Sequence, residues 1–216
     1  MEISLKVFMQ RWIILLLWTV QTYEVWQKMQ EVGYLRGNVA NVEEDWVSCY
    51  QWMIEQMRLR IKAPSHGHAY SYPIWAWYQW QNDKKNKPDL RYSALLRRGE
   101  KGVLIEFEIE QDSVLLSDFG LWHFVLNYWY LPSSLQDMNQ FEEELRKINL
   151  SFYRQKPLPN KDFHMRIVRS WEKIFDLDWV DAEQEITSTK NDKSIQATMW
   201  EVRLEQIQSV REFVAK

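Results

Sequence analysis

The segment Gly102–Leu131 constrains the fold of this chain more than any other stretch of the sequence. In its first part, apolar side chains alternate with mostly acidic ones, the period of two that is typical of a half-buried strand. A turn at Gln111 leads into a second, shorter strand, and Ser117 or Asp118 then caps a helix over Leu121–Tyr130. That helix is apolar nearly all round and has to be covered, so we expect this unit to lie inside the protein.

The other elements are predicted from the same periodicities and from cap and turn residues. Strands are expected over Trp12–Gln21, Tyr70–Trp80, Ile195–Leu204 and Val210–Val214, with a helix over Glu205–Phe213 as the alternative to the last strand. Helices are expected between Thr22 and Gly33 and over Val42–Ile61, 134–148 and 161–175. Together these elements predict an α+β fold.

A chain of 216 residues can bury a sizeable core without a disulfide or a structural metal. We expect a single domain over 1–216, with residues 1–11 as a loose N-terminal extension and 133–176 as a helical insertion. The apolar segment Trp12–Trp18 is much shorter than the roughly 20 residues that span a bilayer, and no cleavage site follows it. We therefore interpret it as a buried strand and expect no membrane association.

The chain has one cysteine, Cys49, so a disulfide within the chain is excluded. It lies beside Val47 and Tyr50 on a predicted helix, where a buried, unreactive thiol is expected. This fits a reducing compartment and predicts a cytoplasmic protein. The net charge of −3 gives no general attraction to nucleic acid or to acidic membranes.

The sequence contains 13 tryptophans, and they are most crowded in YSYPIWAWYQW, residues 70–80. A strand here places Tyr72, Ile74, Ala76, Tyr78 and Trp80 on one face and Pro73, Trp75, Trp77 and Gln79 on the other. Both faces carry rings, so at least one of them has to contact something other than solvent. Two interpretations stay open, namely packing beneath helices and a cleft for a flat ligand.

The usual nucleotide-phosphate and hydrolase motifs are absent, since the sequence has no Gly-x-Gly-x-x-Gly, no Gly-Lys-Ser loop and no Gly-x-Ser-x-Gly elbow. His66 and His68 could bind a metal from a strand, but Pro64 and Gly67 place them in a loop, where we expect them in solvent. No metal site is predicted. The polar segment Asn82–Gly102 is rich in Lys and Arg and is either a solvated loop or a surface for phosphate groups of a nucleotide or RNA.

A few polar side chains on the predicted elements are candidates for chemistry. His123 and Asn127 are four residues apart on one face of the central helix, with Asp118 at its start. They either act as a base and an orienting amide or satisfy buried backbone groups. Gln196 shares a strand face with Trp200, and its amide either contacts a ligand or forms a hydrogen bond in the core.

Six segments of the sequence resemble the bacterial family known as domain of unknown function 3841. In chain order they are LLWTVQTYEVWQKMQEVGYLRG, YPIWAWYQW, KPDLR, VLLSDFGLWHFVLNYWYL, SWEKIF and IQATMWEVRLEQI. The resemblance extends from about Leu17 to the end of the sequence. It implies a family and supplies no activity.

A second resemblance is to the ADP-ribosyltransferase superfamily, in particular its DNA- and RNA-modifying toxins. LWTVQTYEVWQKMQEVGYL and IQATMWEVRLEQIQSVREF follow the order of a first strand, a helix ending in glycine and a late strand. The resemblance implies a mixed, mainly antiparallel sheet, continuous or split, packed with several helices. It also implies NAD as the candidate cofactor and a tyrosine on a middle strand, which corresponds to Tyr72 or Tyr78.

The same resemblance assigns positions to the other catalytic residues of that superfamily. Thr19 stands where the superfamily has histidine, and Gln21 follows two residues on. The catalytic glutamate corresponds to Thr198 or, after a shift, to Gln196 or Glu201. In such enzymes the acid holds the ribose hydroxyls and favours an oxocarbenium-like transition state. Without it, the fold could persist with ligand binding alone.

The leading hypothesis is therefore an ADP-ribosyltransferase-like domain that binds NAD or another nucleotide-like ligand in an aromatic cleft. The candidate catalytic residues are Thr19, Tyr72, His123, Gln196 and Glu201. The candidate ligand-binding residues are Trp18, Gln21, Trp75, Trp77, Asp118, Asn127 and Trp200. One alternative is a non-catalytic module with a protein partner, and a less favoured one is RNA binding through Lys84–Arg98. The leading hypothesis requires the opening, middle and closing strands to line one pocket.

Overall fold

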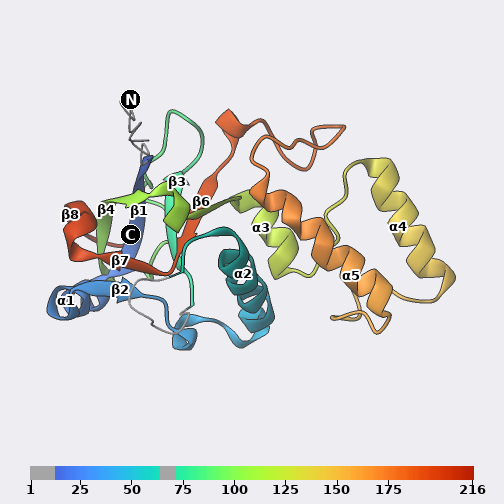
Figure 1. The fold of residues 1–216 in the computed structure, drawn as a ribbon, viewed down its shortest axis with the longest axis horizontal. Helices are drawn as coiled ribbons and strands as arrows, with labels where there is room; N and C mark the ends of the chain where they lie inside the picture. The colour runs from blue at the N-terminus through green and yellow to red at the C-terminus, as the bar shows by residue number, and fades with distance from the viewer. Residues whose placement is uncertain (1–12, 64–71) are drawn as a thin grey trace, which may run out of the picture.

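The structure is a computed structural model that describes residues 13–63 and 72–216. It contains a six-stranded antiparallel sheet of order β5-β6-β3-β1-β4-β8 and a two-stranded sheet of β2 and β7 (Figure 1). The strands are β1 (Ile14–Thr22), β2 (Tyr34–Arg36), β3 (Ile74–Gln79), β4 (Lys101–Glu110), β5 (Leu115–Asp118), β6 (Ile195–Met199), β7 (Glu201–Arg203) and β8 (Ile207–Val214). The helices are α1 (Tyr23–Val32), α2 (Val47–Arg60), α3 (Phe119–Leu126), α4 (Leu135–Lys147) and α5 (Lys161–Ser170). The predicted α+β fold with a mainly antiparallel sheet is confirmed.

β1 lies inside the large sheet and pairs with β4 along its whole length. The chain passes directly from β1 into α1, because the Thr22 side chain accepts a hydrogen bond from the Val25 backbone N–H and so caps the helix. α1 ends at Gly33, whose φ of 86° is a left-handed conformation that glycine adopts without steric cost. Both ends of this helix agree with the sequence prediction.

One face of the large sheet is covered by α1. Met29 of this helix packs into a buried cluster with Leu17 of β1 and with Ile105 and Phe107 of β4. Successive side chains of a strand point to opposite faces, so the acidic residues of β4 point away from this cluster. The alternation in the sequence therefore has a direct structural cause.

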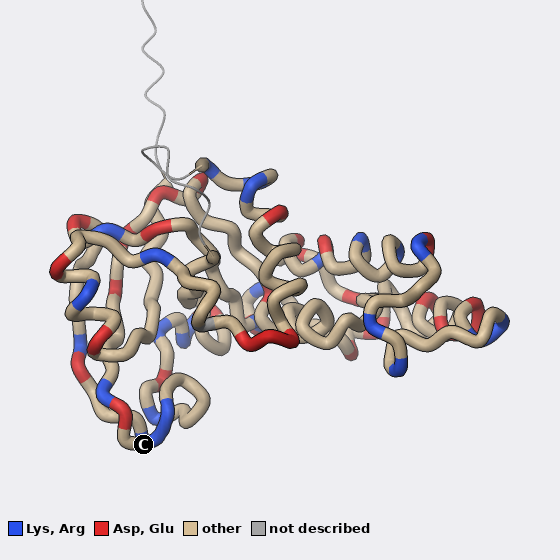
Figure 2. Tube along the Cα trace, turned by 90° about the horizontal axis from the view of Figure 1, so that it is seen from below, with Lys and Arg blue, Asp and Glu red and all other residues tan. Residues whose placement is uncertain are grey.

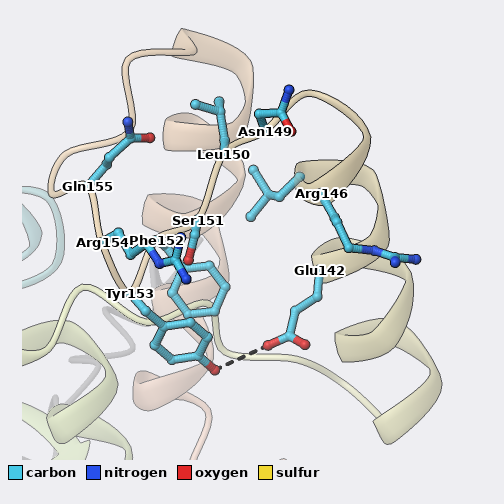
Figure 3. Close-up of a pocket in the computed structure, with 10 residues that line it drawn as sticks. Glu142, Arg146, Asn149, Leu150, Ser151, Phe152, Tyr153, Arg154 and Gln155 are labelled. Carbon is cyan, nitrogen blue, oxygen red and sulfur yellow. Dashed lines mark hydrogen bonds between the residues drawn. The ribbon is translucent and has the colours of Figure 1, made fainter.

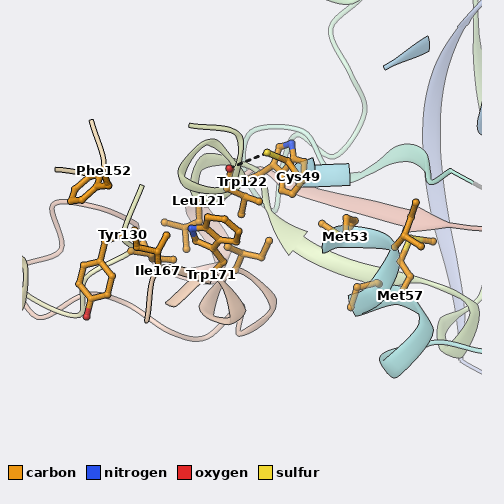
Figure 4. Close-up of a cluster of buried hydrophobic side chains, with 14 of the residues drawn as sticks. Cys49, Met53, Met57, Leu121, Trp122, Tyr130, Phe152, Ile167 and Trp171 are labelled. Atoms are coloured by element: carbon orange, nitrogen blue, oxygen red, sulfur yellow. Dashed lines mark hydrogen bonds between the residues drawn. The ribbon is translucent and has the colours of Figure 1, made fainter. Parts of the chain in front are cut away.

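The opposite face of β5, β6 and β3 is covered by α2 and α3. Thr198 of β6 contacts Met53 of α2, and the Trp75 ring lies 5.1 Å from the Trp122 ring of α3. Figure 4 shows this second cluster, in which Met53, Trp122 and Trp171 come from three different helical segments. The central unit predicted from Gly102–Leu131 thus lies between the sheet and the remaining helices.

α4 and α5 lie beyond α3, at the end of the molecule far from the large sheet (Figure 1). We call residues 135–175 the helical arm. As predicted, Ser134 caps α4 by accepting a hydrogen bond from the Asp137 backbone N–H. Phe141 of α4 is fully buried and stacks on Tyr130, with ring centroids 3.9 Å apart. Side-chain packing of this kind ties the arm to the segment that follows α3.

Several boundaries differ from the prediction, each for a local reason. The segment Ile195–Leu204 forms two strands, because β7 leaves the large sheet after Trp200 and pairs with β2. The same pairing makes Tyr34–Arg36 a strand, in a stretch where the sequence predicted neither a helix nor a strand. The last segment is the strand β8, so the alternative helix is wrong.

Three helices are shorter than the sequence pattern indicates. α5 ends at Ser170 instead of residue 175, because Trp171–Phe175 form a 3₁₀ helix. α2 begins at Val47 instead of Val42, because two 3₁₀ turns precede it. α3 ends at Leu126 instead of Tyr130, because Tyr128 adopts a positive φ of 58° that ends the helix. The apolar sequence extends beyond the helix because Tyr130 and Leu131 are also buried in the core, although they are not helical.

Two parts of the sequence prediction fall outside the described residues, namely the N-terminal extension 1–11 and the loop with His66 and His68. No helix within residues 13–63 and 72–216 has the length and apolar character needed to cross a bilayer. In the same ranges, no three His, Cys, Asp or Glu side chains are grouped so that they could hold a metal ion.

Candidate functional site

A cavity of about 660 Å³ opens beside the end of β1 and the start of α1. Its other walls are β2, the turn that follows β2, Tyr50 of α2 and the first residues of β3. Three of the candidate residues, Gln21, Tyr72 and Trp75, line it. We call this cavity the β1–β3 cleft.

Aromatic side chains form one wall of the β1–β3 cleft. The Tyr50 ring contacts both Tyr72, at a centroid distance of 6.4 Å, and Trp75, at 5.7 Å. Gln51 donates an amide hydrogen bond of 2.9 Å to the Tyr72 hydroxyl and so fixes that ring. Burial raises the pKa of the Tyr50 hydroxyl, which stays protonated at neutral pH. The wall is therefore uncharged and offers ring faces on which a flat molecule can stack.

Hydrogen bonds connect Gln21 to the backbone of this wall. Gln21 Nε2 donates to Thr19 Oγ1 at 2.8 Å, and the Thr19 hydroxyl donates to the Trp75 carbonyl oxygen at 2.8 Å. Thr19 is only 1% exposed, so its hydroxyl positions Gln21 and does not itself reach the cavity. Of these two residues, Gln21 is the one that lines the cavity.

The charged side chains that line the described part of the cleft are two cations, Lys28 of α1 and Arg36 of β2. Arg36 lies over the Tyr34 ring, 4.3 Å from its centroid. Its Nε donates to Glu201 Oε2 at 2.7 Å, and its Nη2 donates to the same oxygen. The second carboxylate oxygen of Glu201 accepts from Arg203 Nε at 2.7 Å. Glu201 therefore fixes Arg36 at the cavity wall but is not itself among the lining residues.

The rim of the cleft depends on a close approach of two backbone segments at Gly37. Gly37 and Tyr72 form an isolated β-bridge. A Cβ atom at position 37 would lie 2.2 Å from the Tyr72 carbonyl oxygen, so a glycine is required there. The bridge holds Tyr72 opposite the β2 side of the cavity.

A second group of candidate residues lies in register across the large sheet. Gln196 pairs with Ser117 on one side and Trp77 on the other, and Trp77 pairs with Trp18. The Trp18 indole donates a hydrogen bond of 2.7 Å to Glu106. The amide nitrogen of Gln196 and the hydroxyl of Ser117 are buried without a hydrogen bond to any described residue. This row does not line the β1–β3 cleft.

The tryptophans of β3 consequently have different surroundings. Trp75 packs against Trp122 and also lines the cleft, so it fits both interpretations of the aromatic row. Trp77 contacts Trp80 at 4.5 Å and Phe119 at 4.9 Å between ring centroids, away from the cleft. A register irregularity after Trp77 then changes the alternation of side chains predicted for the end of this strand.

The three polar candidates on the central helix contact their own backbone or its neighbours. His123 Nδ1 lies 3.0 Å from the Phe119 carbonyl oxygen, and Asn127 Nδ2 donates to the His123 carbonyl oxygen at 2.8 Å. Asp118 caps α3 by accepting from the Leu121 N–H at 3.1 Å. It also accepts from the Thr187 hydroxyl at 2.8 Å. The hydrogen bonds of His123 and Asn127 are both solvent-exposed, so the backbone groups that these two side chains contact are not buried ones.

The last candidates lie at the junction of β6 and β7. Trp200 and Glu201 line a separate cavity of about 280 Å³, together with Lys62, Glu110 and Arg203. Thr198, the other position proposed for the catalytic acid, is fully buried, and its hydroxyl donates to the Leu115 carbonyl oxygen at 3.3 Å. Neither position presents a free acid to the β1–β3 cleft.

Another hollow, of about 710 Å³, lies in the helical arm (Figure 3). Tyr153 and Glu142 face each other across it and share a hydrogen bond of 3.2 Å. Arg146 and Arg154 also line it. No candidate residue from the sequence lies in this hollow.

The basic segment 82–101 is partly neutralised by its neighbours. Lys87 lies 3.4 Å from Glu106, and Arg91 forms an ion pair of 2.6 Å with Asp89. Figure 2 shows Lys and Arg interspersed with Asp and Glu over both the sheet and the helical arm. The charge distribution therefore gives little support to an extended surface for RNA.

Sequence reasoning did not identify three of the residues that shape the cleft. Arg36 lies in a stretch where the sequence predicted neither a helix nor a strand, and Lys28 reads as an ordinary exposed residue of an amphipathic helix. Tyr50 was noted only as a neighbour of Cys49. The one signal in the sequence is that an aromatic residue, Tyr34, and a basic residue, Arg36, follow Gly33 closely. This signal is too weak to indicate a binding site unless the pairing of β2 with β7 is known.

The family model described as Domain of unknown function (DUF3841) matches residues 16–208. The chain belongs to this family. The matched range contains the whole β1–β3 cleft of this DUF3841 domain, including Gln21, Arg36 and Tyr72. A search of curated proteins and a search of solved structures found no match.

Proposed function

We propose that this DUF3841 domain binds NAD or a related nucleotide in the β1–β3 cleft. The observation that carries the proposal is the chemistry of the lining, in which aromatic rings and two cations occur together with no acid among the described lining residues. A nucleotide has the complementary parts, a flat base and anionic phosphates. The cytoplasmic location expected from the sequence would give the domain access to such ligands.

The individual groups suggest how the ligand is held. The faces of Tyr72 and Trp75 offer stacking surfaces for a base, with the Gln21 amide beside them. The Arg36 guanidinium is already oriented by Glu201 and Tyr34, so less side-chain freedom is lost when it contacts a phosphate. A volume of about 660 Å³ lies in the range of roughly 300–1,000 Å³ that is typical of small-molecule sites.

ADP-ribosyl transfer is a second candidate function. β1 and β6 are the two neighbours of β3, so the opening, middle and closing strands lie side by side in the large sheet. The transfer hypothesis requires all three strands to line one pocket, and no residue of β6 is among those that line the β1–β3 cleft. Binding without transfer is better supported, because Glu201 uses both carboxylate oxygens on arginines. Transfer would require that carboxylate to exchange an arginine for the ribose hydroxyls.

Isothermal titration calorimetry with NAD and ADP-ribose tests the binding proposal. Tyr72→Ala and Arg36→Met are each expected to weaken binding by about tenfold or more, as is typical of a lost stacking or charge-assisted contact. Tyr92→Ala and Arg97→Met are the matched controls, since both residues are exposed and lie outside the cleft. If neither nucleotide binds, or if the cleft variants bind as well as the controls, the proposal is wrong.

Incubation with labelled NAD and cell extract tests transfer separately. Label on a macromolecule that is lost in both Tyr72→Ala and Glu201→Gln supports the transferase. Binding of NAD without label transfer supports a binding domain. Retention of a protein from extract without NAD binding favours the interaction module, and affinity for RNA that falls steeply with added salt favours the basic segment.

A further inference from the structure

A cavity of about 730 Å³ lies where α2 meets the base of the helical arm, apart from the β1–β3 cleft. Its walls come from the start of α2, the C-terminal end of α3, residues 156–157 and α5. None of the residues that line the β1–β3 cleft lines this cavity. We call it the junction cavity.

The aromatic lining of the junction cavity is held in place by ring contacts. Trp52 and Trp171 meet edge to face at 5.5 Å, and Tyr128 meets Trp171 in the same way at 5.9 Å. The indole N–H of Trp171 donates to the Trp129 carbonyl oxygen at 2.7 Å, which fixes that ring further. Trp46 completes the lining and is 36% exposed, so part of this side chain remains accessible to a ligand. The site is therefore preformed and suits a flat molecule.

Hydrogen bonds orient the polar pair Tyr128 and His164. The Leu158 backbone N–H donates to the Tyr128 hydroxyl oxygen at 3.0 Å, and this hydroxyl lies 2.7 Å from His164 Nδ1. The Leu158 N–H occupies one acceptor position of this hydroxyl, and burial raises the pKa of Tyr128, so the hydroxyl keeps a proton that it can donate to Nδ1. In that arrangement the imidazole proton of His164 lies on Nε2. That N–H has no hydrogen-bond partner among the described residues and is available to a ligand in the cavity.

A cation lines the same cavity. Lys156 is exposed and forms no ion pair within residues 13–63 and 72–216. The acid on the lining, Asp45, lies in the turn before α2, where the helix dipole accounts for a negative charge. No comparable structural role accounts for Lys156. The ammonium group and the His164 N–H together form a donor set for an anion.

We propose that the junction cavity binds a planar aromatic molecule that carries one carboxylate or phosphate group. The ring lies among Trp46, Trp52 and Tyr128, and the anionic group accepts hydrogen bonds from Lys156 and from His164 Nε2. This site is independent of the nucleotide proposed for the β1–β3 cleft.

Calorimetric titration with 2-naphthoate, 2-naphthalenemethanol and 2-naphthylmethylamine at neutral pH tests the proposal. These probes share one ring system and differ in charge. We expect 2-naphthoate to bind with one-to-one stoichiometry and at least tenfold more tightly than the other two. Equal affinities for the carboxylate and the amine, or no binding of the carboxylate, would overturn the proposal.

Variants locate the binding. Lys156→Gln is expected to remove the preference for 2-naphthoate over the alcohol, and Trp46→Ala is expected to weaken both by about tenfold. Lys161→Gln is the matched control, since Lys161 is exposed on α5 and does not line the cavity. Tyr72→Ala should bind 2-naphthoate normally, which separates this site from the nucleotide site. Unchanged binding by both Lys156→Gln and Trp46→Ala would contradict the assignment.

A spectroscopic readout is independent of affinity. Long-range ¹H–¹⁵N spectra should show His164 with its proton on Nε2, and 2-naphthoate should shift that signal. A proton on Nδ1, or no shift at saturating 2-naphthoate, would contradict the proposed donor set.

Discussion

Arg36 and Glu201 form an ion pair that connects β2 with β7, although 165 positions separate the two residues in the sequence. The Glu201 side chain is 9% exposed, and Arg203 contacts its other oxygen. One carboxylate thus joins the first quarter of the chain to its last strands and holds a cation at the β1–β3 cleft.

Replacing Glu201 is therefore expected to destabilise the fold. Glu201→Gln leaves Arg36 and Arg203 side by side without their shared anion, and we expect the free energy of unfolding to fall by about 1–3 kcal/mol, since the arginines are partly solvated. Urea denaturation measures this. Glu143→Gln is the control, because Glu143 and its partner Arg146 form a solvent-exposed ion pair that contributes little to stability. Equal losses in the two variants would contradict the structural role of Glu201.

The Trp18–Glu106 hydrogen bond should make stability depend on pH. The bond from the Trp18 indole lowers the pKa of Glu106, and Lys87 acts in the same direction. This contribution to stability is present above the unfolded pKa of about 4.3 and is lost as the pH falls through the lower folded pKa. Trp18→Phe should raise the pKa of Glu106 in a ¹³C NMR titration and reduce the loss of stability as the pH falls below about 4.3. An unchanged Glu106 titration in this variant would be inconsistent with the bond.

Gly37 should not tolerate a side chain. In Gly37→Ala, the new Cβ would lie 2.2 Å from the Tyr72 carbonyl oxygen, so the β-bridge has to open. We expect the free energy of unfolding to fall by about 2 kcal/mol or more, measured by thermal unfolding, and NAD binding to weaken. Gly120→Ala is the contrast, because its Cβ would meet only Asp118 Oδ1, at 3.2 Å. For Gly120→Ala, the free energy of unfolding should change by no more than about 1 kcal/mol.

The thiol of Cys49 should be unreactive in the folded protein. It is 6% exposed and donates to the Val125 carbonyl oxygen at 3.3 Å (Figure 4). Burial raises its pKa, so little thiolate is present at pH 8. Modification by a chromogenic disulfide should be slow in buffer and fast in denaturing urea. Rapid reaction of the native protein would contradict this burial.

The parts of the fold that the sequence predicts well have strong local signals. Thr22 and Gly33 delimit α1, and Ser134 begins α4, because cap residues act on backbone groups only a few positions away. The alternation in β4 is similarly local. The split between β6 and β7 was missed, since it results from the pairing of β7 with a strand far away in sequence.

The candidate site likewise contains residues that the sequence predicts and residues that depend on distant pairing. Gln21, Tyr72 and Trp75 stood out by residue type and position, and they do line one cavity. Trp77 lies two residues from Trp75 and was expected beside it, but it packs toward Phe119. Arg36 could not be found from the sequence, because its orientation depends on Glu201. Periodicity specifies which face a side chain occupies, whereas only tertiary pairing specifies which neighbours it meets.

The strand order has a consequence for biosynthesis. β3 and β4 each have one neighbour from the last part of the chain, β6 and β8 respectively, and within the described residues the partner of β2 is β7. An emerging polypeptide therefore exposes the unpaired edges of its early strands until residues 195–214 have left the ribosome. Nascent chains shorter than this lack these strand pairings, and the Arg36 side of the β1–β3 cleft forms only after β7 has been synthesised.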